Sequence, residues 1–200
     1  APAIYAGINP ENGRFFVGSK SIFAKNAKLN YTEADIRANH QGGLAEKLSQ
    51  ALKYLPELGI KGIVHGDFMY SNSDLTPATI DGKRYITFRP NTITYAVPDG
   101  TPLAAQIKAS KIGIVFHTTY TGKTMQTLQT HFDVNIGNFN KSRNVWFRTN
   151  RLLDVTKAAR LSLSDKEHLN DILKQAGNVF RTIPAGLLNE IAVSETYKVQ

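Results

Sequence analysis

Short segments rich in β-forming residues alternate irregularly with helical patterns along most of this chain. Residues 1–9 and 14–19 are two such segments, and the turn-forming residues 10–13 (Pro-Glu-Asn-Gly) between them are typical of a β-hairpin. Further extended segments are expected at residues 60–70, 84–97 (around Pro90) and 111–120. This irregular alternation predicts a mixed α/β or α+β domain.

Helices are expected between these segments. Thr32 can cap a helix, with Asp35 three residues on. After the Gly42-Gly43 break, four leucines share a helical stripe: Leu44, Leu48, Leu52 and Leu55. We expect this helix to pack on the sheet, and residues 102–110 to form a short helix.

The pattern becomes helical after about residue 150. Ser164 and Glu167 have the spacing of a capping box, and Pro184 can open a further helix. Apolar residues follow the first cap at helical spacing: Leu169, Ile172, Leu173 and Ala176. We therefore expect an α/β core over residues 1–150 and a helical segment over 151–200.

Charge and composition restrict the functional classes. The 24 Lys and Arg against 16 Asp and Glu give a net charge of +8, which favours contact with nucleic acid or nucleotide phosphates but is also common in proteins without that function. The chain has no cysteine, which excludes disulfides and thiolate chemistry. No apolar run approaches the about 20 residues of a membrane-spanning helix, so no membrane contact is expected.

The extended segment 60–70 carries ionisable side chains on one face. A period of two aligns Lys61, Ile63, His65, Asp67 and Met69. The neighbouring glycine would let a ligand approach, and a carboxylate there could bind a ribose hydroxyl or a metal ion. The alternative is a half-exposed strand whose polar face meets water.

The segment 111–120 has the same periodicity. Ile112, Ile114, Phe116 and Tyr120 are expected to face the core, whereas Lys111, Gly113, Val115, His117 and Thr119 share the other face. His117 could contact a phosphate or transfer a proton, or it could form a structural hydrogen bond beside two threonines.

A basic and aromatic segment covers residues 138–151. Lys141, Arg143, Trp146 and Arg148 combine cations with an aromatic ring, as proteins do that hold a phosphate backbone and stack on bases. The other interpretation places Trp146 and Phe147 in the core and leaves only the charges exposed.

Residues 1–23 (APAIYAGINPENGRFFVGSKSIF) resemble the stretch that follows the nucleophilic Lys-x-Asp-Gly motif in phage ligase-like proteins of the covalent nucleotidyltransferase family, the ATP-dependent DNA and RNA ligases. Ser19-Lys20 resembles the second motif of this family and residues 65–68 (His-Gly-Asp-Phe) the third. The strand with Phe88 resembles the element whose aromatic ring stacks on adenine, a role for which Tyr85 and Tyr95 compete.

This resemblance implies an α+β fold with packed helices and a mixed, mainly antiparallel sheet of nucleotidyltransferase (ATP-grasp-like ligase) type. It also implies ATP and Mg²⁺ as substrate and cofactor. It implies that Lys20 holds a phosphate, Gly66 and Asp67 meet the ribose or metal, and Phe88 meets adenine. The nucleic acid would lie near Lys141, Arg143, Trp146 and Arg148.

The chain also departs from the family pattern. The nucleophilic lysine is missing, Pro2 stands where many ligases have arginine, and no Glu-Gly-x-Val motif occurs. We expect Ala1 to be an internal start and this chain alone to be inactive.

Three functions follow as expectations: an incomplete phage ligase, a non-catalytic phage virion or assembly protein that interacts with phage structural proteins, or a basic nucleic-acid-binding module. The expected location is the cytoplasm of the infected host cell, or the virion.

Overall fold

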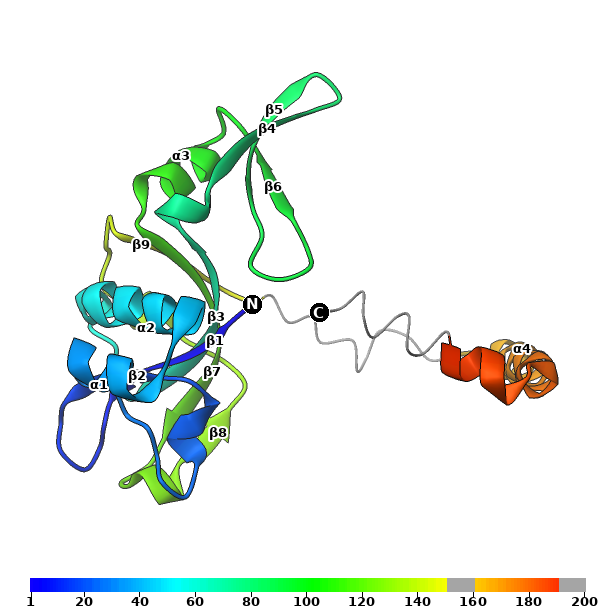
Figure 1. Ribbon diagram of the computed structural model, residues 1–200, viewed down its shortest axis with the longest axis horizontal. Helices are drawn as coiled ribbons and strands as arrows, with labels where there is room; N and C mark the ends of the chain where they lie inside the picture. Colours follow the sequence, from blue (N-terminus) through cyan, green and yellow to red (C-terminus); the bar gives the residue numbers. More distant parts are fainter. Residues whose placement is uncertain (151–160, 191–200) are drawn as a thin grey trace. The chain divides into compact units, whose positions relative to one another are not determined.

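The computed structural model describes residues 1–150 and 161–190 (Figure 1). The chain divides at residue 150 into two compact units, residues 1–150 and 151–200. The first unit contains a six-stranded mixed sheet, a three-stranded antiparallel sheet and helices α1 to α3. The predicted α+β class with a mixed, mainly antiparallel sheet is confirmed.

The large sheet is built from segments far apart in the chain. Its strands are β1 (Ala3–Ile8), β2 (Phe15–Gly18), β3 (Ile63–Ser71), β7 (Ile112–Thr121), β8 (Gln129–His131) and β9 (Val145–Thr149). The order is β2-β1-β3-β7-β8 with antiparallel neighbours, while β9 pairs with β7 in parallel. The hairpin β1–β2 is the predicted one, and its turn is closed by a hydrogen bond from Gly13 N to Asn9 O at 2.8 Å.

Helices α1 (Glu33–Asn39) and α2 (Gly42–Tyr54) cover one face of this sheet (Figure 1). The predicted Thr32–Asp35 capping box begins α1. The leucine stripe lies on α2 as expected, with Leu48 and Leu55 at 0% exposure in the main hydrophobic core. The double glycine opens α2 instead of preceding it.

The predicted faces of β7 are wrong beyond residue 117. The β3–β7 register shifts between His65 and Gly66, so that Gly66 pairs with Phe116 but His65 pairs with Thr118. This bulge inserts one extra residue and reverses the alternation after it. Thr119 therefore shares the helix-covered face with its partner Val64, and Tyr120 lies on the opposite face in the cluster of Tyr5 and Ile63.

A smaller sheet extends from the end of β3. Its strands are β4 (Thr76–Ile80), β5 (Lys83–Phe88) and β6 (Tyr95–Pro98), followed by α3 (Pro102–Ala109). The two extended segments around Pro90 and the short helix were predicted, whereas β4 was not, because it is largely exposed and lacks an apolar alternation. Short 3₁₀ turns connect the elements: η1 (Lys20–Phe23), η2 (Leu55–Leu58), η3 (Asn72–Asp74), η4 (Met125–Thr127) and η5 (Ile136–Asn138).

The second unit is described over residues 161–190. Helix α4 (Leu163–Thr182) begins at a capping box formed by Ser162 and Asp165, not at the predicted Ser164 and Glu167. The predicted apolar stripe lies on α4, and residues 185–190 after Pro184 are helical. In the described ranges 1–150 and 161–190, no helix has both the length and the apolar character needed to cross a membrane.

Candidate functional site

Four polar or aromatic side chains meet on the sheet face opposite α2. The Tyr5 ring of β1 stacks on His65 of β3, with centroids 4.1 Å apart and planes at 10°. His65 meets His117 of β7 edge to face at 4.2 Å. Nε2 of His117 lies 4.0 Å from Oδ2 of Asp67. The structure thus brings together three residues that the sequence had placed on two separate strands, and we call Tyr5, His65, Asp67 and His117 the histidine cluster.

Burial changes the acid–base behaviour of His65. It lowers the pKa of this histidine from 6.5 to about 4, with a smaller lowering from His117 and an opposing effect of Asp67. His65 is therefore neutral at pH 7, and its buried Nε2 has no hydrogen-bond partner among the described residues. Nδ1 of His117 is held by the hydroxyl of Thr118 at 2.8 Å, so its Nε2 faces Asp67. The predicted structural hydrogen bond beside the threonines is thus present at Nδ1, while Nε2 faces the carboxylate of Asp67.

Gly66 serves strand packing. A Cβ at this position would lie 2.7 Å from Val115 O and 2.9 Å from Cγ2 of Ile114. Because β7 occupies the space beside Gly66, the glycine permits the approach of a strand, not of a ligand as the sequence suggested. Asp67 is the residue of this motif that reaches the surface, with 44% of its side chain exposed.

Lys20 lies at the start of η1 and is exposed. The same turn carries Phe23, whose ring packs edge to face on Tyr5 at 5.3 Å. Lys20 therefore belongs to an element that contacts the histidine cluster through Tyr5.

Phe88 is buried, at 5% exposure, in a cluster with Tyr70 and Ile107. One face of its ring is covered by Tyr95, which is stacked at 5.4 Å with planes at 7°. Tyr95 is 38% exposed and is the accessible ring of this pair. Of the aromatics that the sequence offered for stacking on a base, Phe88 is thus in the core, whereas Tyr95 and the half-buried Tyr85, which lines a small cavity with Arg84, are accessible.

The basic and aromatic segment forms a groove against α3. Lys141, Arg143, Trp146 and Arg148 line a cavity of about 750 Å³ together with Gln106 and Ser110, and we call it the β9 groove. Nη2 of Arg148 donates to Oε1 of Gln106 at 3.1 Å, and its guanidinium lies 5.2 Å from the centre of the Trp146 ring. Trp146 is half-buried and packs near Tyr70 at 6.1 Å. Trp146 therefore contacts the core, as the second interpretation of this segment predicted, and it also lines the groove.

Strand register connects the two sites. Asp67 of β3 pairs with Val115 of β7, and Val115 pairs with Arg148 of β9. Paired residues of neighbouring strands point to the same face, so Asp67 and Arg148 lie on one face about 10 Å apart, two strand spacings. No pattern in the sequence predicts this proximity, because it depends on a parallel pairing between segments that are far apart in the chain.

A metal site of protein ligands alone is not found in the part of the chain that the structure describes: no three His, Asp or Glu residues there are grouped to hold an ion. Asp67 offers one exposed carboxylate. Mg²⁺ commonly binds through one or two carboxylates, water and the phosphates of its substrate, so a single carboxylate is compatible with it.

The fold and site define a class: an α+β protein with a histidine cluster on one sheet face and a basic groove at the sheet edge. A family model described as "Family of unknown function (DUF6267)" matches residues 1–200, and the chain belongs to this family. No curated protein and no solved structure matches the chain.

Proposed function

We propose that this chain is the nucleotide-binding and nucleic-acid-binding core of a phage ATP-dependent nucleic-acid ligase of the covalent nucleotidyltransferase superfamily, with a sheet of that type. The row Asp67–Val115–Arg148 is the observation that carries the proposal. It sets a carboxylate suited to a ribose or a metal ion beside a groove suited to a phosphate backbone. A ligase needs both, because it must bring a nucleotide to a nucleic-acid end.

The gap between His117 and Asp67 fits a sugar hydroxyl. Their facing atoms are 4.0 Å apart, too far for a direct hydrogen bond. One hydroxyl between them can donate to the carboxylate and accept from a protonated Nε2. In this proposal Asp67 and His117 orient the ribose of ATP, Lys20 holds a phosphate, and Tyr95, in place of the buried Phe88, stacks on adenine.

The chemical step needs a lysine that these 200 residues do not supply in a Lys-x-Asp-Gly motif. In the proposed reaction that lysine attacks the α-phosphorus of ATP, a P–N bond forms, and pyrophosphate leaves. Mg²⁺ would neutralise charge on the phosphates, and Asp67 is the residue here that would hold it. The residues of this chain bind and orient the nucleotide and the nucleic-acid end.

Intact mass tests the catalytic part of the proposal. The natural chain that contains these residues is isolated from its source and incubated with ATP and Mg²⁺. We expect a gain of one AMP, and a smaller adenylated fraction in the Asp67→Asn variant than in the exposed control Asp81→Asn. A natural chain that gains no AMP would refute the ligase proposal and leave a binding or virion protein.

One observation favours a second candidate, a nucleic-acid-binding module without nucleotide chemistry. Among the described residues, those that line the β9 groove all belong to residues 1–150, whereas Phe88 is covered by Tyr95. Three cations line the groove: Lys141, Arg143 and Arg148. Such a module binds nucleic acid but is not adenylated.

Salt dependence tests the groove in either case. A labelled single-stranded oligonucleotide is titrated with the chain by fluorescence anisotropy over a series of salt concentrations. Three phosphate contacts predict a log–log slope of about −2, and Arg143→Gln should reduce its magnitude by about 0.7. Lys83→Gln, an exposed lysine of β5, is the matched control. Equal slopes for both variants would exclude the groove as the binding site.

A further inference from the structure

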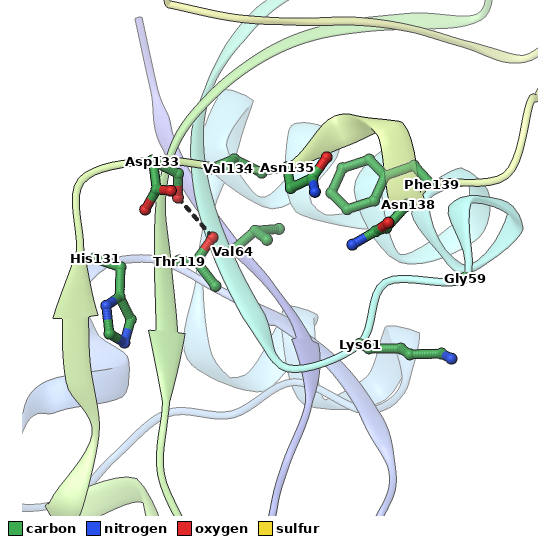
Figure 2. Close-up of a pocket in the computed structure, with 10 residues that line it drawn as sticks. All are labelled: Gly59, Lys61, Val64, Thr119, His131, Asp133, Val134, Asn135, Asn138 and Phe139. Atoms are coloured by element: carbon green, nitrogen blue, oxygen red, sulfur yellow. Dashed lines mark hydrogen bonds between the residues drawn. The ribbon is translucent and has the colours of Figure 1, made fainter.

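A second cavity lies on the other side of the large sheet from the histidine cluster (Figure 2). It forms where the segment from β8 to η5 passes the ends of β3 and β7, and its volume is about 630 Å³. Thr119 and Val64, which pair across β3 and β7 on the helix-covered face, form part of its wall. The large sheet thus separates this cavity from the proposed nucleotide site. We call the cavity the β8–η5 pocket.

Polar groups of the β8–η5 pocket are left open to a ligand. Within residues 1–150 and 161–190, the carboxylate of Asp133 has neither a salt bridge nor a side-chain hydrogen bond. Oδ1 of Asn135 accepts from Gly137 N at 3.1 Å, which fixes the side chain and leaves its NH₂ group to donate. The hydroxyl of Thr119 donates to Asp133 O at 2.8 Å and keeps its lone pairs (Figure 2). Asn138 adds a second exposed amide.

An aromatic ring completes the lining. Figure 2 shows the ring of Phe139 beside Asn135 and Asn138. Phe139 is half-buried and is held edge to face on Phe116, with centroids 5.4 Å apart and planes at 88°. The ring therefore has a defined orientation and offers an apolar surface between amide groups.

The charges disfavour a phosphate ligand. Lys61 supplies the only ammonium of the lining, and Figure 2 shows it directed away from Asp133 and the two asparagines. His131 is engaged through Nε2 with the hydroxyl of Thr121 at 2.8 Å. Asp133 would repel an anion, and this contrasts with the β9 groove, where three cations gather.

A purely apolar ligand does not fit either, because it would desolvate the carboxylate and the amides without giving them partners. A polyhydroxylated ring satisfies all these groups. Its hydroxyls donate to Asp133 and accept from the asparagine NH₂ groups, and its C–H face packs on an aromatic ring. The cavity volume lies within the roughly 300–1,000 Å³ of small-molecule sites.

We propose that the β8–η5 pocket binds a neutral hexose unit, free or as the end of an oligosaccharide, with Asp133 as its main hydrogen-bond acceptor and Phe139 as its stacking surface.

The test uses the 200-residue chain labelled with ¹⁵N and four probes: glucose, galactose, mannose and N-acetylglucosamine. We expect at least one to shift the amide signals of residues 131–139 saturably. Asp133→Asn, which keeps the shape and removes the charge, should weaken this binding about tenfold, the effect of losing a charged hydrogen bond. Asp81→Asn, at the exposed β4–β5 turn, should leave it unchanged.

The proposal is overturned if no probe shifts these signals, if inorganic phosphate shifts them instead, or if Asp133→Asn binds like the wild-type chain. The folded state of the variant is checked by its remaining amide spectrum. The outcome is independent of the ligase proposal, because Asp133→Asn leaves the β9 groove intact and its oligonucleotide binding should be unchanged.

Discussion

His65 and His117 lie on the same sheet face but have different surroundings. His65 is half-buried, with Tyr5 stacked on its ring and His117 against it edge to face, and this burial keeps it neutral. His117 has 26% of its side chain exposed and faces Asp67. At the residue scale, His65 therefore packs against its aromatic neighbours, whereas the imidazole of His117 is accessible from solvent beside Asp67.

The lowered pKa of His65 predicts a loss of stability in acid. The folded state holds this imidazole neutral down to about pH 4, whereas the unfolded chain takes up a proton near pH 6.5. Protons then bind the unfolded state preferentially, so the free energy of unfolding falls as the pH decreases from about 6.5 to 4. Between pH 7 and 5 this residue should account for a loss of about 2 kcal/mol.

Urea unfolding of the wild-type chain and of His65→Gln at pH 7 and pH 5 measures this effect. The variant should lose less stability over that interval, since it has no imidazole to protonate at this site. Equal losses for the two chains would show that His65 is not held neutral by the fold.

At the element scale, the arrangement of the strands depends on close packing between neighbouring strands. Gly113 of β7 lies against the ring of Tyr70, which is fully buried and hydrogen-bonded to the hydroxyl of Ser110 at 2.8 Å. The same ring lies between Phe88 and Trp146, and so connects the small sheet to the β9 groove. The glycine is needed because the tyrosine occupies the space of its missing side chain.

Substitution of Gly113 by alanine should therefore destabilise the fold. The added Cβ would overlap Cε1 of the Tyr70 ring, which is fully buried. We expect a loss of at least about 2 kcal/mol. In Gly43→Ala the new Cβ meets nothing within 4 Å near the start of α2, and stability should rise by roughly 0.5–1 kcal/mol. Similar thermal unfolding of both variants would contradict the packing described here.

At the scale of the whole molecule, the hydrophobic core of the described residues lies in the first unit, residues 1–150. Every side chain that is buried among the described residues belongs to residues 1–150, and α4 contributes none. Both the histidine cluster and the β9 groove belong to the same unit. Residues 1–150 thus contain what the fold needs for stability.

A chain of residues 1–150 should fold alone. We expect a cooperative thermal transition within about 4 °C of that of the 200-residue chain, which corresponds to about 1 kcal/mol for a protein of this size. It should also keep the oligonucleotide affinity of the β9 groove. A non-cooperative transition, or a chain that exposes its core to a hydrophobic dye, would show that residues 151–200 stabilise the core.

Much of the architecture depends on interactions between residues close together in the chain, and the sequence alone determined these parts. Turn residues between β1 and β2, the Thr32–Asp35 cap and the leucine stripe of α2 act over a few positions, so the sequence predicts them directly. The choice between Ser162 and Ser164 as the cap of α4 was missed because both serines have an acidic residue three positions on.

Only the tertiary structure decided which residues meet. The bulge in β7 turned Thr119 and Tyr120 to unexpected faces, and the pairing of β5 with β6 covered Phe88 with Tyr95. The parallel pairing of β7 with β9 brought Arg148 to the face of Asp67. The physical reason is that strand register arises from contacts between segments far apart in the chain, and a shift of one residue moves every later side chain to the other face.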